Sequence, residues 1–251
     1  MKIKSVLISQ PKPETDKSPY YEVSKNHKVS LEFKPFIHVE GVTAAELRKQ
    51  KIDFSDFGCV VMTSKSSIDH YFRLAQEMRF SIPETMKYFC ASETIALYMQ
   101  KYIVYRKRKI FHGTNGVEDL LDYFKKNKTE KFLFPCSDKH SDKITDFLTK
   151  NKIAFTKAAF YKTVSSDMSE FPLSNYDMLV FFSPNGVESL AKNFPDFKQN
   201  DMHIGTFGEG TAQAAEAAGL VVQLKAPMPK APSMAMALDW YLKQVNGKTG
   251  K

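Results

Sequence analysis

The stretch FFSPNGVESL, residues 181–190, joins a strand pattern to a helix pattern across one short turn. An apolar run ends at Ser183, Pro184 follows, and apolar residues then recur at helical spacing. A second stretch, VVMTSKSSIDHYF at residues 60–72, repeats this design around Ser64. Serine is favoured at a helix N-cap and proline in the first helical turn. Each stretch therefore predicts a strand that leads directly into a helix.

Strand-like and helix-like patterns alternate along the whole chain. Several of the strand patterns are continuous apolar runs, which is typical of strands that are covered on both faces. Alternating strands and helices predict an α/β fold, and the number of strands predicts two doubly wound parallel sheets. The predicted strands are 4–9, 33–39, 59–63, 87–91, 102–105, 131–135, 158–164, 178–182, 203–207 and 220–225.

The composition is that of an ordinary globular protein, with 43% hydrophobic and 25% charged residues among 251. No run of 18 apolar residues occurs, so no transmembrane helix is expected, and the first ten residues resemble a strand more than a signal peptide. Cys59, Cys90 and Cys136 are isolated in apolar surroundings. We expect them to be buried thiols in a reducing compartment, which predicts a cytoplasmic protein.

The net charge of +8 favours anionic partners. The densest basic cluster is YRKRK at residues 105–109. It lacks interleaved aromatic residues and belongs to no DNA-binding motif, so a solvated segment is the favoured interpretation. A nucleic-acid patch stays open as an alternative.

Two further turns, CASETIA at 90–96 and FGEGTAQ at 207–213, also place a hydroxyl residue where a strand pattern gives way to a helix pattern. A capping role explains each turn alone. Four such turns favour a site for a carboxylate or phosphate, because helix N-termini bind anions and ligands of parallel sheets lie beyond the carboxyl ends of the strands. The candidate binding residues are Thr63, Ser64, Lys65, Ser66, Thr94, Ser183, Pro184, Asn185, Gly186, Gly208, Gly210 and Thr211.

Motifs for other chemistries are missing. FGEGTAQ has Gln213 where a dinucleotide fingerprint needs its third glycine, and the sequence contains no phosphate-loop motif, HExxH metal motif or GxSxG nucleophile motif. We therefore predict neither a cofactor nor a metal. Tyr161, in AAFYKTV, is a candidate proton donor, because a phenol with a pKa of about 10 is protonated at neutral pH. Packing within a strand is the alternative role for this tyrosine.

Together with CASETIALYM and FGEGTAQAAEAAGLVVQLKAPMPKAPSMAMAL, these stretches resemble the uroporphyrinogen-III synthase family over almost the whole chain. The resemblance implies two flavodoxin-like parallel-sheet domains joined by a two-stranded connector, with the active-site cleft between them. Transferred to this chain, it implies connector strands at 33–39 and 158–165. One domain would comprise 40–157, and a discontinuous domain would comprise 1–32 plus 166–251.

The activity that the resemblance implies is a cofactor-free lyase reaction of tetrapyrrole and haem biosynthesis. Hydroxymethylbilane, a linear tetrapyrrole with eight carboxylates, would lose water and close to uroporphyrinogen III with ring D inverted, and Tyr161 would donate a proton. The sequence shows no exposed apolar heptad or edge signature, which predicts a monomer, and we expect neither a nucleic-acid nor a membrane partner. The resemblance also allows a transient hand-over of substrate from the preceding pathway enzyme.

The chain departs from the family pattern in three stretches. ISQPKP and FPCSDKHSDK lack arginines that many members carry there, and CASET replaces a commoner turn that contains glycine. Lys65, Lys139 and Lys162 are candidate replacements for these cations. The departures also motivate an alternative function, in which the chain is a non-catalytic two-domain binder of a polycarboxylate or other anionic ligand.

Overall fold

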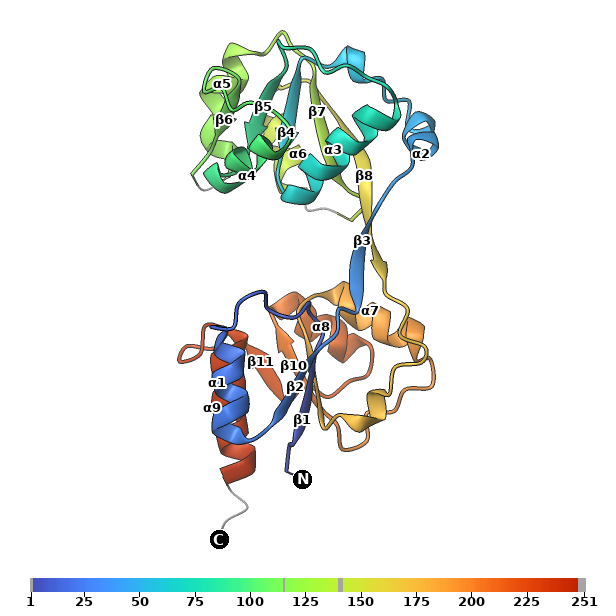
Figure 1. Cartoon of the computed structure of the whole chain (residues 1–251), viewed down its shortest axis with the longest axis vertical. Helices are drawn as coiled ribbons and strands as arrows, with labels where there is room; N and C mark the ends of the chain where they lie inside the picture. Colours follow the sequence, from blue (N-terminus) through green and yellow to red (C-terminus); the bar gives the residue numbers. More distant parts are fainter. Residues whose placement is uncertain (1, 115, 140–141, 248–251) are drawn as a thin grey trace. The chain divides into compact units, whose positions relative to one another are not determined.

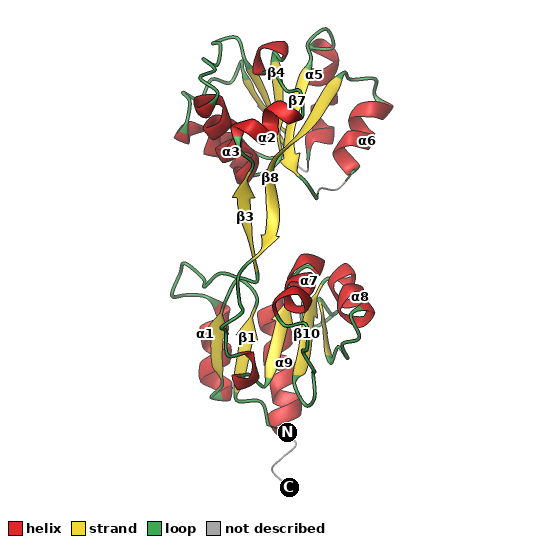
Figure 2. Cartoon of the chain, turned by 90° about the vertical axis from the view of Figure 1, so that its right-hand side faces the viewer, coloured by secondary structure: helices red, strands yellow, loops and turns green. Residues whose placement is uncertain are grey.

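The computed structural model describes residues 2–114, 116–139 and 142–247. The chain divides into two units (Figures 1 and 2). Unit 1 comprises Met1–His38 and Val164–Lys251, and unit 2 comprises Val39–Thr163. The predicted domain limits, whose C-terminal end lies outside the described residues, stay a prediction.

Unit 1 contains a five-stranded parallel sheet in the order β11-β10-β9-β1-β2. Read from the other edge, this is the 2-1-3-4-5 order of flavodoxin-like folds. Two helices cover each face (Figure 2). The elements are β1 (Ser5–Ile8), α1 (Pro19–His27), β2 (Ser30–Phe33), β9 (Met178–Phe181), α7 (Pro184–Asn193), β10 (His203–Phe207), α8 (Glu209–Ala217), β11 (Leu224–Ala226), α9 (Met234–Gly247) and the 3-10 turn η4 (Leu173–Asn175).

Unit 2 is built on a six-stranded sheet in the order β3-β8-β7-β4-β5-β6, in which β4 to β8 pair in parallel. Its strands are β3 (Ile37–Gly41), β4 (Cys59–Met62), β5 (Lys87–Cys90), β6 (Ile110–His112), β7 (Phe132–Ser137) and β8 (Phe155–Ser165). Its helices are α2 (Ala44–Lys49), α3 (Lys65–Glu77), α4 (Glu93–Tyr98), α5 (Leu121–Lys126) and α6 (Lys143–Lys150), with 3-10 turns η1 (Phe54–Asp56), η2 (Met99–Lys101) and η3 (Val117–Leu120).

The core of unit 2 explains why β4 reads as a continuous apolar run. Side chains alternate between the two faces of a strand. Cys59 and Val61 pack on one face with residues of α5 and α6, whereas Val60 and Met62 pack on the other with residues of α2, α3 and α4. Both faces of the strand are therefore buried, as the sequence predicts.

The two sheets share one spatial plan. If β7 is taken as the first strand of unit 2, the order β8-β7-β4-β5-β6 is again 2-1-3-4-5. The central strand is β9 in unit 1 and β4 in unit 2, and each leads into a helix whose N-cap is a serine, Ser183 or Ser64. The repeat seen between the two serine stretches is thus a repeat of the fold.

The chain passes between the units twice, first within β3 and then within β8. These two strands are neighbours at the edge of the unit 2 sheet (Figure 2). The strand predicted at 33–39 is divided, because β2 ends at Phe33 and β3 begins at Ile37. Pro35 lies in the interruption and has no N–H for a strand ladder.

The strand predicted at 102–105 is wrong. The N–H groups of Tyr102 and Ile103 both bond to the carbonyl of Met99, which closes the helical segment, and Val104 is 77% exposed. The edge strand is β6, which follows the basic YRKRK stretch. The strand predicted at 220–225 is also shorter and begins only at Leu224.

The three cysteines are free and buried, as predicted. Within the described ranges, no helix combines the length and the apolar character that crossing a membrane would require.

A carboxylate fastens the start of β1 to the loop before β9. Oδ2 of Asp177 accepts hydrogen bonds from the backbone N–H groups of Lys4 (2.7 Å) and Ser5 (3.0 Å). Partial burial raises the pKa of Asp177, but these hydrogen bonds outweigh it and hold the pKa below its usual value. The interaction therefore stabilises the fold in the ionised form.

We expect Asp177→Ala to lower the free energy of unfolding by about 2 kcal/mol at neutral pH, because charge-assisted hydrogen bonds are lost. In the unmodified chain, the contribution of Asp177 is complete above the unfolded-state pKa of about 4 and is lost as pH falls through the lower folded-state pKa. Denaturant unfolding at several pH values measures both effects. Asp196→Ala, at an exposed carboxylate, should change stability by less than about 0.5 kcal/mol. An equal loss in both variants would contradict the role of Asp177.

Candidate functional site

Both serine turns lie where each sheet reverses its strand order. The order reverses between β4 and β7 in unit 2 and between β1 and β9 in unit 1. Ligands of open parallel sheets bind beyond the carboxyl ends of the strands at such a point. Ser64 follows β4 and Ser183 follows β9, so each unit carries a candidate anion site at its own switch point.

In unit 2 the structure brings Ser64 and Tyr161 together. The Ser64 Oγ and the Tyr161 phenol oxygen are 3.1 Å apart and share a hydrogen bond. The same Oγ accepts from the N–H of Ser67 (3.0 Å), while the Ser67 hydroxyl bonds the N–H of Ser64 (3.2 Å), which completes a capping box at the start of α3. Ser64 therefore caps the helix and contacts the phenol at once.

A β-bulge puts Tyr161 in this position. Cys136 on β7 is paired with Ala159 on β8, but the next residue, Ser137, is paired with Tyr161, so β8 has one extra residue. Neighbouring residues of a regular strand point to opposite faces. Because of the bulge, Phe160 and Tyr161 are both buried, at 0% and 9% exposure, in the core cluster beneath α3.

The surroundings of Tyr161 favour the neutral phenol. Burial raises the pKa of Tyr161, and the hydrogen bond between Tyr161 and Ser64 lowers it by less. A phenol whose pKa is above 10 is fully protonated at neutral pH. The side chain can therefore donate a proton to a group that reaches it.

His70 also belongs to this site, although the sequence reasoning missed it. Its ring stacks on that of Tyr161, with centroids 5.4 Å apart and planes at 24°. Ser64, Ser67 and His70 follow one another at intervals of three residues, and this spacing puts them along one stripe of a helix. That periodicity was the signal that could have identified His70.

Lys65 follows the cap of α3 and lies over an aromatic ring. Its Nζ is 5.2 Å from the ring centroid of Tyr98, and the Nζ of Lys101 is 5.4 Å from the same centroid. The Tyr98 hydroxyl donates to Asp69 on α3 (3.0 Å), which fixes the ring. Lys65 is exposed, so its charge is accessible beside the helix terminus.

The other predicted residues of unit 2 lie near the same edge with different roles. Thr63 directly follows β4 and its N–H bonds the Ser67 hydroxyl (3.3 Å), and Ser66 lies in the first turn of α3 without capping it. Thr94 is exposed in the first turn of α4, whose cap is Ser92. The sequence reasoning had not singled out Ser92.

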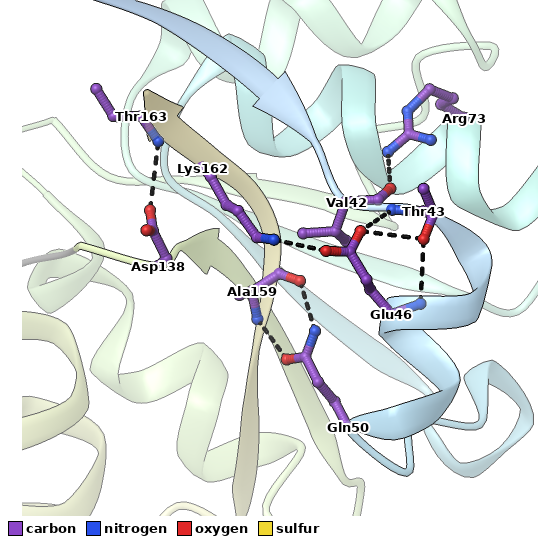
Figure 3. A network of polar contacts seen from close by, with 9 residues as sticks. All are labelled: Val42, Thr43, Glu46, Gln50, Arg73, Asp138, Ala159, Lys162 and Thr163. Atoms are coloured by element: carbon purple, nitrogen blue, oxygen red, sulfur yellow. Dashed lines mark hydrogen bonds and ion pairs between the residues drawn. The ribbon is translucent and has the colours of Figure 1, made fainter. Parts of the chain in front are cut away.

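The lysines proposed to replace family arginines are not equivalent. Lys162 bonds Oε1 of Glu46 (2.5 Å), as Figure 3 shows. This contact is the main cause that lowers the pKa of Glu46 to about 2, and it raises that of Lys162. Lys139 likewise has a partner of its own. Lys65 differs from both, since it is exposed and its ammonium group lies over the Tyr98 ring.

Figure 3 also shows how β8 is held by Gln50, the residue after α2, and by Asp138, the residue after β7. The side-chain amide of Gln50 accepts from the N–H of Ala159 and donates to its carbonyl, both at 2.9 Å. Asp138 accepts from the N–H of Thr163 (3.3 Å). These contacts bracket Tyr161 along β8 and fix the backbone that carries the phenol.

In unit 1, Ser183 caps α7 by accepting from the N–H of Gly186 (3.2 Å), with Pro184 in the first turn. Asn185 in this turn makes contacts of its own. A Cβ at Gly186 would lie 3.8 Å from the hydroxyl of Ser9, which follows β1. Ser9 thus places a further hydroxyl at this switch point. Its position at the end of the first predicted strand could have identified it from the sequence.

The start of α8 is the fourth turn. Its N-cap, Gly208, has a φ of +88° and forms no side-chain cap, and a Cβ at Gly210 would meet no atom within 4 Å. Thr211 is buried, and among the described residues the buried Thr206 hydroxyl has no hydrogen-bond partner. Helix α8 therefore begins with N–H groups that no side chain covers, and such groups attract anions.

Within the described ranges, no group of three or more His, Cys, Asp or Glu side chains gathers in a way that could hold a metal ion. The YRKRK stretch forms the turn before β6, where Arg106 pairs with Glu84 (3.4 Å).

A family model and two solved structures match this chain. The family model described as uroporphyrinogen-III synthase HemD matches residues 25–236. The uroporphyrinogen-III synthetase from Helicobacter pylori is similar in structure, with a TM-score of 0.59, 14% identity, and coverage of 96% of this chain and 100% of that chain. A mutant uroporphyrinogen III synthase from Thermus thermophilus gives a TM-score of 0.52 at 12% identity over 98% of this chain and 99% of that chain. No curated protein matches the sequence. The structural matches show a shared fold with two parallel-dominated sheets.

Removing the Ser64 hydroxyl should both destabilise the start of α3 and change the pKa of the Tyr161 phenol. We expect Ser64→Ala to cost about 1 kcal/mol of stability through the lost N-cap. It should also raise the pKa of Tyr161, because the Ser64 hydrogen bond lowers it. NMR of chains labelled with ¹³C at the tyrosine ζ carbon, assigned with Tyr161→Phe, follows this titration. Ser183→Ala removes a similar cap and should leave the pKa of Tyr161 unchanged. A pKa of Tyr161 that falls or stays constant in Ser64→Ala would contradict the hydrogen bond.

Proposed function

The chain belongs to the uroporphyrinogen-III synthase family, a family of cyclising enzymes of tetrapyrrole biosynthesis, and we propose that it converts hydroxymethylbilane to uroporphyrinogen III. The observation that carries this proposal is the protonated phenol of Tyr161, hydrogen-bonded to the serine that caps α3. The first step needs an acid, and simple binding of an anion does not. The catalytic interpretation is therefore preferred to a non-catalytic binder of polycarboxylates.

Binding of the substrate is proposed to rest on the helix starts. Hydroxymethylbilane carries eight carboxylates, and a carboxylate is stabilised by the N–H groups and the dipole of a helix N-terminus. Ser64 with Lys65, Ser183 with Gly186, and Gly208 with Gly210 are the proposed contacts. The net charge of +8 adds a general attraction for such a substrate.

The proposed chemistry begins at ring A of the substrate. Tyr161 donates its proton to the ring A hydroxyl, the C–O bond breaks, and water leaves, while the pyrrole nitrogen stabilises the resulting cation. The substituted carbon of ring D then attacks this cation to form a spiro intermediate, whose rearrangement closes the macrocycle with ring D inverted. The proton that ring D loses on aromatisation restores the phenol. The binding contacts hold the flexible cation in the geometry for this attack.

Finer properties are proposed on the same basis. The loss of water makes the enzyme a lyase. We propose that it acts as a monomer in the cytoplasm, where its free buried thiols stay reduced, and receives its substrate from the preceding enzyme of the pathway.

The product tests the function. Hydroxymethylbilane closes without an enzyme to the type I isomer, so we expect the purified chain to yield the type III isomer when it is supplied with this substrate. Chromatographic separation of the two isomers after oxidation measures the outcome. Formation of type I alone, at the rate seen without protein, would exclude the proposed function.

The acid is tested by Tyr161→Phe, which should lower turnover about 100-fold, the effect typical of a lost general acid. Stability should change by about 1 kcal/mol or less, because one hydrogen bond is removed and the ring is kept. Tyr241→Phe is a matched control, since Tyr241 is also 9% exposed and bonds a side chain, His203 (2.7 Å). Full activity of Tyr161→Phe would remove the phenol from the mechanism.

A further inference from the structure

We propose that His70 is a positioning residue for the Tyr161 phenol, and that its ring is held for this purpose by Arg73 in the space left by Gly41. The proposal rests on the proposed function of Tyr161 as the proton donor. It assigns a role to a cluster of three residues on α3 and β3 that the binding contacts described above do not use.

The stack supplies a restraint that the hydrogen bond to Ser64 lacks. A tyrosine ring rotates in a broad, two-fold torsional well about the bond to its Cβ atom, so a hydrogen bond at the hydroxyl fixes the tip but not the plane. The His70 ring lies against the face of the phenol, at 5.4 Å between centroids and 24° between planes. Together, Ser64 and His70 restrain both the position of the hydroxyl and the orientation of the ring.

His70 is itself held by Arg73, one turn further along α3. Nε of Arg73 donates to Nδ1 of His70 (3.3 Å). The guanidinium is fixed from two sides, because Nη2 donates to the Val42 carbonyl (2.6 Å), drawn in Figure 3, and Nη1 donates to Glu77 (2.6 Å). The imidazole therefore reaches Tyr161 as part of a fixed array that joins α3 to the chain after β3.

The same array defines the protonation state of His70. Arginine can only donate, so Nδ1 must be the unprotonated nitrogen and Nε2 carries the hydrogen of a neutral ring. Burial lowers the pKa of His70, the Arg73 charge lowers it further, and Asp69 on the same helix opposes both. A neutral imidazole adds no positive charge beside the phenol, so it does not promote loss of the Tyr161 proton.

Gly41, the last residue of β3, leaves room for this array. A Cβ at this position would lie 2.5 Å from Nη2 of Arg73 and 2.7 Å from Nδ1 of His70. Both distances are well inside van der Waals contact, so a side chain at position 41 must displace the guanidinium and the imidazole. The sequence therefore needs glycine here for space rather than for backbone conformation.

Three variants test the proposal in the full-length chain. His70→Ala removes the stack and should lower kcat about tenfold, with KM changed less than about twofold, because an aromatic pair contributes about a factor of ten at most. His70→Phe keeps a flat ring and should retain most of kcat. Gly41→Ala should reproduce the loss of His70→Ala, since it displaces the same rings. His203→Ala, which removes a half-buried histidine bonded to Tyr241, controls for general destabilisation and should leave kcat unchanged.

A second readout is independent of turnover. The ¹³Cζ signal of Tyr161 should broaden or split and its pKa should fall in His70→Ala, as the phenol gains freedom and water, but stay near the unmodified value in His70→Phe. If His70→Ala leaves both kcat and this signal unchanged, the proposal is overturned. It is also overturned if His70→Phe is as impaired as His70→Ala, because a stack is then insufficient. If the Tyr161 signal responds while Tyr161→Phe is fully active, His70 positions the phenol and the proposed function of Tyr161 has failed.

Discussion

The hydrogen bond between the Ser64 hydroxyl and the Tyr161 phenol links the parts of the unit 2 site. It can form because the Ser64 side chain already lies at the N-cap of α3 and because the bulge in β8 turns Tyr161 inward. Burial then keeps the phenol protonated. A helix terminus that attracts carboxylates and an acid that can protonate a leaving group thus lie within one hydrogen bond of each other.

Unit 1 also has a helix that begins at a serine N-cap, but no counterpart of Tyr161 is described beside it. Ser183 caps α7 as Ser64 caps α3, and the start of α8 adds uncovered N–H groups. Among the described residues of unit 1, we propose none as a proton donor. This division suits a reaction in which many carboxylates must be held but only one hydroxyl must be protonated. In the proposed function, the helix starts of the two α/β units bind the carboxylates and the bulged strand carries the acid.

Local sequence patterns correctly predicted the elements that depend on interactions between residues close together in the chain. Apolar runs predicted the buried strands, and serine at the strand ends predicted the caps at Ser64 and Ser183. The bulge beside Ser137 depends on pairing between strands and leaves no mark in the sequence of β8. The spacing of Ser64, Ser67 and His70 could have placed His70 near the cap, but its contact with Tyr161 could not be predicted, since the two residues are distant along the chain. The strand predicted at 102–105 failed because its apolar residues close a helix instead.

The central claim is that Tyr161 acts as a general acid, and its direct test is to change the acidity of that phenol alone. Fluorinated tyrosine at position 161 has a lower pKa and nearly the same shape. Because activity needs the protonated phenol, the basic limb of the pH profile of kcat/KM should move to lower pH as fluorine atoms are added. A basic limb that stays at the same pH across the fluorinated series would contradict the account.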